Sequence, residues 1–202
     1  MTERPRVGLF GGSFDPVHNA HLALARSALA TLRLDEVRWI PAGLAWQKGG
    51  SATPAADRTA MVELAIAGEP CFHVERCEIE RAGPSYTIDT VLELSAREPG
   101  TRWCLIVGQD QLARLPTWHR WRELVALVQI AVAERAGEAV QAPVEVAAAG
   151  ASLHEVALPP MAISATDIRA RVRAGQDITA LVPAPVAGYI AEHGLYREPA
   201  RS

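Results

Sequence analysis

The stretch Arg6-Val7-Gly8-Leu9-Phe10-Gly11-Gly12-Ser13 gives the first indication of the fold class. Its first five residues form a short, mostly apolar run, which is typical of a strand buried inside a parallel sheet. Two glycines follow, and from about residue 20 to residue 32 apolar side chains recur at spacings of three and four, which predicts a helix. A strand, a glycine turn and a helix in this order indicate the first unit of an α/β domain.

The alternation of strand and helix continues along the chain. Further strands are predicted over residues 36–40, 72–81 (short or bent), 102–107, 129–133 and 153–157, and further helices over 57–67, 87–97, 166–173 and from 183 to about 193. This order predicts a Rossmann-like, doubly wound parallel α/β sheet with helices on both faces and a short C-terminal helical part. We expect one domain over residues 1–202, with 136–151 as a surface loop or insertion and Asp57 as a helix N-cap.

Composition narrows the class of protein. The 202 residues include 20 Lys and Arg against 23 Asp and Glu, a formal charge of −3, which argues against a nucleic-acid partner. No apolar stretch long enough for a signal peptide follows the first six residues, and no apolar run approaches the roughly 20 residues of a membrane span. We therefore expect a cytoplasmic protein without a membrane partner. The three cysteines are odd in number and lack CxxC spacing, so we expect reduced thiols and no cysteine metal site.

The turn after the first strand has the properties of a phosphate site. It lacks both the GxGxxG spacing of a dinucleotide fingerprint and the GK[ST] of a P-loop. Gly11 and Gly12 nevertheless allow a phosphate to approach the backbone closely. The helix that follows directs its first N–H groups and the positive end of its dipole toward the same place. We therefore expect Gly11, Gly12 and Ser13 to hold phosphate oxygens.

Two histidines lie at the start of that helix. His18 and His21 are three residues apart, so both rings can face one anion. Imidazole N–H groups there would stabilise charge that develops on phosphorus. On spacing alone, a pair of metal ligands and two incidental histidines, one of them capping the helix, remain alternatives.

A second anion motif lies near the C-terminus. Ser164 is a plausible N-cap of the helix predicted from residue 166, which places Thr166 in its first turn. Arg169, three residues later, shares a face with Thr166, and its guanidinium suits phosphate groups. The alternative is a capped helix with an ordinary surface arginine.

Several segments resemble a known family. Residues 11–21 resemble the GG[ST]FDPxHxxH signature of the nucleotidylyltransferase superfamily. Other segments resemble motifs of its bacterial nicotinate-mononucleotide adenylyltransferases, in the same order: PSYT at 84–87 with Thr90, GQD at 108–110 with Leu112, Leu115 and Trp118, ISATDIR at 163–169, and the LVP, YI and GLY groups between 181 and 196.

The resemblance implies adenylyl transfer from ATP to nicotinate mononucleotide without a covalent enzyme intermediate. The chemistry of ATP implies that Mg²⁺ accompanies it. ATP and nicotinate mononucleotide are then the partners, and a homo-oligomer is left open. The resemblance implies the following roles: His21, His18 and Arg169 catalytic; Gly11, Gly12, Ser13, Phe14, Lys48, Asp110, Ser164, Thr166 and Arg169 binding ATP; Ser85, Tyr86, Thr87, Trp118 and His119 binding the mononucleotide. Asp110 would contact a ribose or the Mg²⁺, with a structural role at the strand end as the alternative. Trp118 would stack on the pyridine ring, with a place in the core as the alternative, and Trp121 is expected in the core.

One segment departs from the family pattern. The family usually carries PPH[KR] after the second strand, where this chain has Gly43-Leu44-Ala45-Trp46-Gln47-Lys48, so that only the cation of Lys48 is kept. In the next helix, Arg58 is either a structural partner or a phosphate contact. Alternative functions are an adenylyltransferase acting on nicotinamide mononucleotide or phosphopantetheine, and an adenine-nucleotide sensor without turnover.

Overall fold

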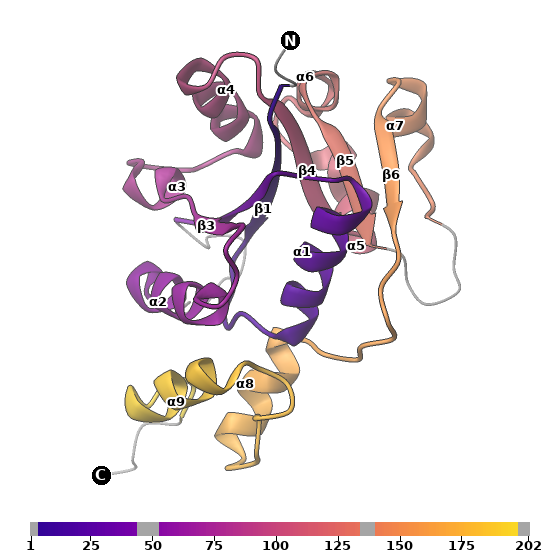
Figure 1. The fold of residues 1–202 in the computed structure, drawn as a ribbon. Helices are drawn as coiled ribbons and strands as arrows, with labels where there is room; N and C mark the ends of the chain where they lie inside the picture. Colours follow the sequence, from indigo (N-terminus) through magenta and orange to yellow (C-terminus); the bar gives the residue numbers. More distant parts are fainter. Residues whose placement is uncertain (1–3, 44–52, 134–139, 198–202) are drawn as a thin grey trace.

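The computed structural model describes residues 4–43, 53–133 and 140–197 (Figure 1). The strands of one parallel sheet are β1 (Arg6–Gly12), β2 (Glu36–Pro41), β3 (Phe72–Val74), β4 (Arg102–Gly108), β5 (Gln129–Ala133) and β6 (Ser152–Val156). The helices are α1 (Asn19–Thr31), α2 (Ala55–Ile66), α3 (Cys77–Glu80), α4 (Thr87–Arg97), α5 (Gln109–Arg114), the 3₁₀ turn η1 (Leu115–Thr117), α6 (Trp121–Leu127), α7 (Val144–Ala148), α8 (Ala165–Arg173) and α9 (Ala184–Glu192).

The sheet has the strand order β3-β2-β1-β4-β5-β6. The chain winds outward from β1 to β3, returns to the centre at β4 and winds the other way to β6. Every pairing is parallel, and β1 and β4 are in direct register, with Leu9 opposite Leu105. This order confirms the predicted doubly wound sheet. The direction of winding reverses between β1 and β4, and ligands of such sheets bind beyond the carboxyl ends of the two strands at this point.

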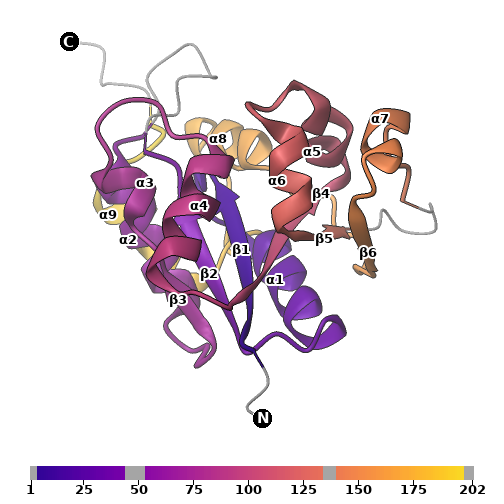
Figure 2. The ribbon, with the colours of Figure 1, turned by 90° about the horizontal axis from the view of Figure 1, so that it is seen from above.

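Each face of the sheet carries its own apolar core, because side chains alternate along each strand. Phe10 and Ile106 face the core formed with α1, α2, α8 and α9, whereas Leu9 and Leu105 face the core formed with α4, α5 and α6. Figure 2 shows α1 and α4 on opposite faces of the sheet. Burial on both faces explains the apolar runs in the central strands.

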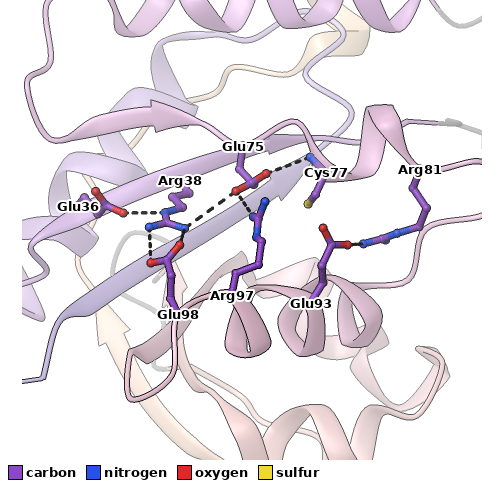
Figure 3. Close-up of polar contacts among 8 residues, drawn as sticks. All are labelled: Glu36, Arg38, Glu75, Cys77, Arg81, Glu93, Arg97 and Glu98. Atoms are coloured by element: carbon purple, nitrogen blue, oxygen red, sulfur yellow. Dashed lines mark hydrogen bonds and ion pairs between the residues drawn. The ribbon is translucent and has the colours of Figure 1, made fainter.

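An ionic cluster fastens the far end of α4 to the sheet (Figure 3). Arg38 on β2 donates two hydrogen bonds to Glu98, at 2.6 and 2.8 Å, and one to Glu36 at 2.7 Å. Arg97 donates to Glu75 at 2.5 Å. The hydrogen bonds from Arg38 hold the pKa of the Glu98 carboxyl below its usual range. Anchoring the end of α4 in this way fixes where its first turn lies, at the opposite edge of the sheet.

Three local predictions need correction. The stretch 72–81 contains only the three-residue strand β3 and then α3, because the Glu75 carboxylate accepts the N–H of Cys77 at 3.1 Å and the chain turns there. Asp57 is not an N-cap: α2 begins after Pro54, and Asp57 accepts a hydrogen bond from the Tyr189 hydroxyl at 2.9 Å. A short helix, α7, lies within the predicted loop 136–151, because its Val146 is fully buried.

Candidate active site

The turn between β1 and α1 lies at the carboxyl edge of the sheet. A Cβ atom on Gly11 would meet no atom within 4 Å, so the protein leaves open the space beside this backbone. A Cβ atom on Gly12 would lie 3.0 Å from the ring of Phe14. Phe14 as a whole is 1% exposed and its ring belongs to the core, so it offers almost no surface to a ligand.

The two histidines of the turn lie together, as their spacing predicts. Their rings are stacked, with centroids 3.6 Å apart and planes inclined by 19°. The backbone N–H of His18 donates to Nδ1 of His21 at 3.2 Å. Because an accepting nitrogen carries no proton, the neutral His21 ring must hold its proton on Nε2. The backbone of the turn thus selects the tautomer of His21 that has Nε2–H as its donor.

His18 is buried at the first residue before α1. It is 7% exposed, and its Nδ1 atom has no hydrogen-bond partner among the described residues. Burial lowers the pKa of His18 to about 4, because the charged ring would lose its hydration. The ring is therefore neutral at neutral pH. Among the described residues, no group of three His, Cys, Asp or Glu side chains is placed to hold a metal ion.

The C-terminal helices brace this turn through Asp15. The Asp15 carboxylate is 6% exposed and accepts a hydrogen bond from the Tyr196 hydroxyl at 2.7 Å. The Asp15 carbonyl accepts one from Arg169 at 2.7 Å. Arg169 also donates to the Thr166 hydroxyl at 3.3 Å, and Ser164 caps α8 by accepting the N–H of Asp167 at 3.1 Å. The predicted N-cap is confirmed, and the fold brings the second anion motif to the histidine turn.

The protein itself supplies hydrogen-bond acceptors to the first residue of α1. The backbone N–H of Asn19 donates to the carbonyl of Leu181 at 2.9 Å, and its side-chain amide donates to Ala180 at 3.1 Å. Figure 1 shows α8 and α9 beside the end of the sheet at which α1 begins. One of the orphan amides of the helix is thus already satisfied by the protein.

Arg58 is a structural residue of this region. Its side chain is buried, and it donates to the carbonyls of Thr53 at 2.9 Å, Ser13 at 2.7 Å, Ala42 at 2.6 Å and Gly43 at 3.1 Å. The guanidinium therefore joins the ends of β1 and β2 to the start of α2. Of the two roles open for Arg58, the structural one is confirmed.

The start of α4 and the segment between η1 and α6 lie next to each other at the carboxyl edge of the sheet. Tyr86 precedes α4 and Thr87 is its first residue, while His119 lies between η1 and α6. The rings of Tyr86 and His119 have centroids 4.5 Å apart. Trp118 is half-buried against the core next to α4, and Trp121 is buried in that core, as predicted. The fold thus brings together the residues predicted for the mononucleotide.

Two further residues are predicted to bind ATP. Asp110 stands in the first turn of α5, directly after β4 and hence at the same edge as Gly11. Lys48 lies outside the described residues. Sequence reasoning missed the pairing of Asp15 with Tyr196, because no local signal links residues 181 positions apart.

The doubly wound sheet and the histidine turn at its carboxyl edge are those of an α/β nucleotidyltransferase. Over residues 9–171 the chain matches the cytidylyltransferase-like family. It is 50% identical to a probable nicotinate-nucleotide adenylyltransferase of Methylibium petroleiphilum, over 96% of this chain and 93% of that protein. It is 50% identical to the one of Bordetella petrii, over 95% and 99%. The chain belongs to the cytidylyltransferase-like family, and within it to the nicotinate-nucleotide adenylyltransferases.

A solved structure agrees with the fold. The structure of the Plasmodium falciparum nicotinic acid mononucleotide adenylyltransferase complexed with NaAD has a TM-score of 0.79, covering 96% of this chain and 98% of that one. The two sequences are 17% identical, so the likeness concerns the fold. In the described parts of this chain, no helix has the length and apolar character needed to cross a bilayer.

Proposed function

We propose that this protein transfers the adenylyl group of ATP to nicotinate mononucleotide, forming deamido-NAD and pyrophosphate for NAD biosynthesis. The observation that carries the proposal is the stacked pair His18 and His21 at the point where the winding of the sheet reverses. Near full-length identity to probable nicotinate-nucleotide adenylyltransferases supports the choice of acceptor.

The reaction is a direct displacement at phosphorus. A 5′-phosphate oxygen of the mononucleotide forms a bond to the α-phosphorus of ATP, and the bond from that phosphorus to the bridging oxygen breaks. Pyrophosphate leaves with the electron pair. Because the attacking oxygen is already an anion, no strong general base is required. Catalysis then consists of alignment and stabilisation of charge.

The histidines and Arg169 supply that stabilisation in this proposal. His21 donates from Nε2 to the α-phosphate, in the tautomer that the backbone of His18 selects. His18 lies beside it as a neutral ring, because burial holds its pKa near 4. Arg169, fastened to the turn through the Asp15 carbonyl, contacts the departing phosphates. The remaining ATP contacts are Gly11, Gly12, Ser13, Lys48, Asp110, Ser164 and Thr166.

The mononucleotide lies on the side of α4. Ser85, Tyr86 and Thr87 line the pyridine ring together with Trp118 and His119, and Trp118 stacks on it. Backbone N–H groups in this segment are good donors to a nicotinate carboxylate and poor partners for the NH₂ side of a carboxamide. Unpaired polar groups thus offer a route to discriminate acid from amide.

Magnesium enters this scheme with ATP. Mg²⁺ is commonly held by substrate phosphates together with one or two carboxylates. Asp110, exposed at the end of β4, is a carboxylate that suits this arrangement, and a ribose hydroxyl is its alternative partner. The ion, when bound, draws charge from the phosphate oxygens.

A pyrophosphate-release assay tests the function. Purified protein with ATP and Mg²⁺ is given nicotinate mononucleotide, nicotinamide mononucleotide or phosphopantetheine. We expect the fastest release with nicotinate mononucleotide. Faster release with another acceptor would reassign the substrate, and release with none would favour a nucleotide sensor.

Variants test the role of His21. We expect His21→Ala to raise the barrier by about 2.7–4 kcal/mol, a loss of roughly 10²–10³ in kcat, as for removal of an oxyanion donor. His193→Ala, at an exposed histidine beyond α9, is the matched control and should retain activity. Near-normal turnover by a folded His21→Ala protein would overturn the assignment.

A further inference from the structure

A chain of hydrogen bonds lies beneath the segment that carries Ser85, Tyr86 and Thr87. The Thr90 hydroxyl donates to Oε1 of Glu78 at 2.9 Å, and Arg81 donates to the same hydroxyl at 3.2 Å. Arg81 also donates to Glu93 at 2.5 Å, a pair that Figure 3 shows between the end of α3 and α4. We refer to Glu78, Thr90 and Arg81 as the α3–α4 clasp.

The hydroxyl of Thr90 is directed away from its own helix. Threonine in a helix commonly donates to the carbonyl four residues earlier, as Thr59 does to Ala55 at 2.7 Å in α2. A hydroxyl has one proton, and that of Thr90 goes to Glu78. Thr90 is 1% exposed, so both of its polar contacts are shielded from water. Truncating this side chain would remove the hydrogen-bond donor to Glu78 and one acceptor of Arg81, which would keep its bond to Glu93.

The clasp encloses the segment between α3 and α4. Arg81 directly follows α3, and Thr90 stands in the first turns of α4, so residues 82–87 form a loop whose two ends are tied together. The Ser85 hydroxyl donates to the backbone carbonyl of Glu78 at 3.4 Å, which adds a third attachment within the loop. The position of Thr87 therefore depends on α3 as well as on α4.

Glu78 of α3 is also linked to the β1–α1 turn, through Gly43 and Arg58. A Cβ atom on Gly43 would lie 2.1 Å from the carbonyl oxygen of Glu78, so the two backbones are in direct contact. The carbonyl of Gly43 accepts a hydrogen bond from Arg58 at 3.1 Å, and Arg58 donates to Ser13 at 2.7 Å. Glu78 thus stands between the loop 82–87 and the scaffold of the β1–α1 turn.

We propose that Thr90 and Glu78 are positioning residues, which hold the loop 82–87 in the conformation that binds the pyridine mononucleotide. They touch neither substrate and act through Ser85 and Thr87. The inference rests on the proposed function, and it adds that affinity for the acceptor, and not for ATP, depends on the clasp.

Steady-state kinetics of Thr90 variants test the proposal. We expect Thr90→Val to raise KM for nicotinate mononucleotide by about tenfold, the effect of losing roughly 1.4 kcal/mol of binding. The KM for ATP should stay within about twofold of the wild-type value. Thr90→Ser keeps the hydroxyl and should restore the acceptor KM. A merely structural role would not produce this split between the two substrates, nor its reversal by serine.

Thr59→Val is the matched control, because it removes the hydroxyl of another buried helical threonine that bonds only within its own helix. It should lower the melting temperature and leave both KM values unchanged. If Thr90→Val does not fold, Arg81→Met at a more accessible position should give a smaller rise in the acceptor KM alone. Equal changes in both KM values, or unchanged KM values, overturn the proposal. If the wild-type protein releases no pyrophosphate, the proposed function fails instead.

Discussion

The neutral, buried ring of His18 predicts how the stability of the protein depends on pH. Its pKa is about 4 in the folded protein and 6.5 in the unfolded chain. Below pH 6.5 the unfolded chain therefore binds a proton that the folded protein does not, and the free energy of unfolding falls as the pH is lowered. The loss is complete below about pH 4, where it amounts to roughly 3 kcal/mol. Between about pH 7.5 and pH 5 it is about 2 kcal/mol.

The perturbation is His18→Asn, which removes the titrating ring and retains a residue favoured before a helix. Urea unfolding, followed by tryptophan fluorescence at the two pH values, gives four free energies. We expect the stability of wild type relative to the variant to decrease by about 2 kcal/mol from the higher to the lower pH. A relative stability that stays constant within about 0.5 kcal/mol, or increases toward low pH, would refute the assigned burial of a neutral ring. An NMR titration of the His18 ring gives the same answer independently, through a midpoint below pH 5.

Three further substitutions test the scaffold of the site. Tyr196→Phe leaves the buried Asp15 carboxylate without its phenolic donor, so we expect a loss of about 1–3 kcal/mol in stability by calorimetry and a lower kcat; unchanged values would contradict the brace. Arg58→Met leaves four carbonyls without their donor, and urea unfolding should show a loss of at least about 3 kcal/mol; a loss below about 1 kcal/mol would argue against its role. Gly43→Ala forces a Cβ atom against Glu78, so thermal unfolding should reveal about 1–3 kcal/mol of destabilisation, and an unaltered melting temperature would show that this contact is not tight.

Local periodicity was sufficient to predict most of the elements. The helix predicted over 87–97 is α4 without any shift in its ends, because Ile88, Val91 and Leu94 form one buried stripe and Pro99-Gly100 follow it. The strand predicted over 129–133 is likewise β5. In contrast, β3 was predicted too long, since the side chain of Glu75 turns the chain through a bond that periodicity does not record.

The site was predictable where a motif is continuous in the sequence. The spacing of His18 and His21 is enough to place both rings on one face of a helix. The contacts that hold this motif in place join separate segments: Arg58 reaches carbonyls from three of them, and Thr90 bonds to side chains outside its helix. Such contacts depend on the packed fold, and a single sequence carries no signal for them.

The bond between Asp15 and Tyr196 has a consequence for biosynthesis. Asp15, in the turn after the first strand, accepts its hydrogen bond from Tyr196, which is synthesised 181 residues later. Until residue 196 leaves the ribosome, the Asp15 carboxylate of the nascent polypeptide lacks this partner, even if the sheet has already formed. Adenylyl transfer is therefore expected to reach its full rate only after residue 196 has left the ribosome.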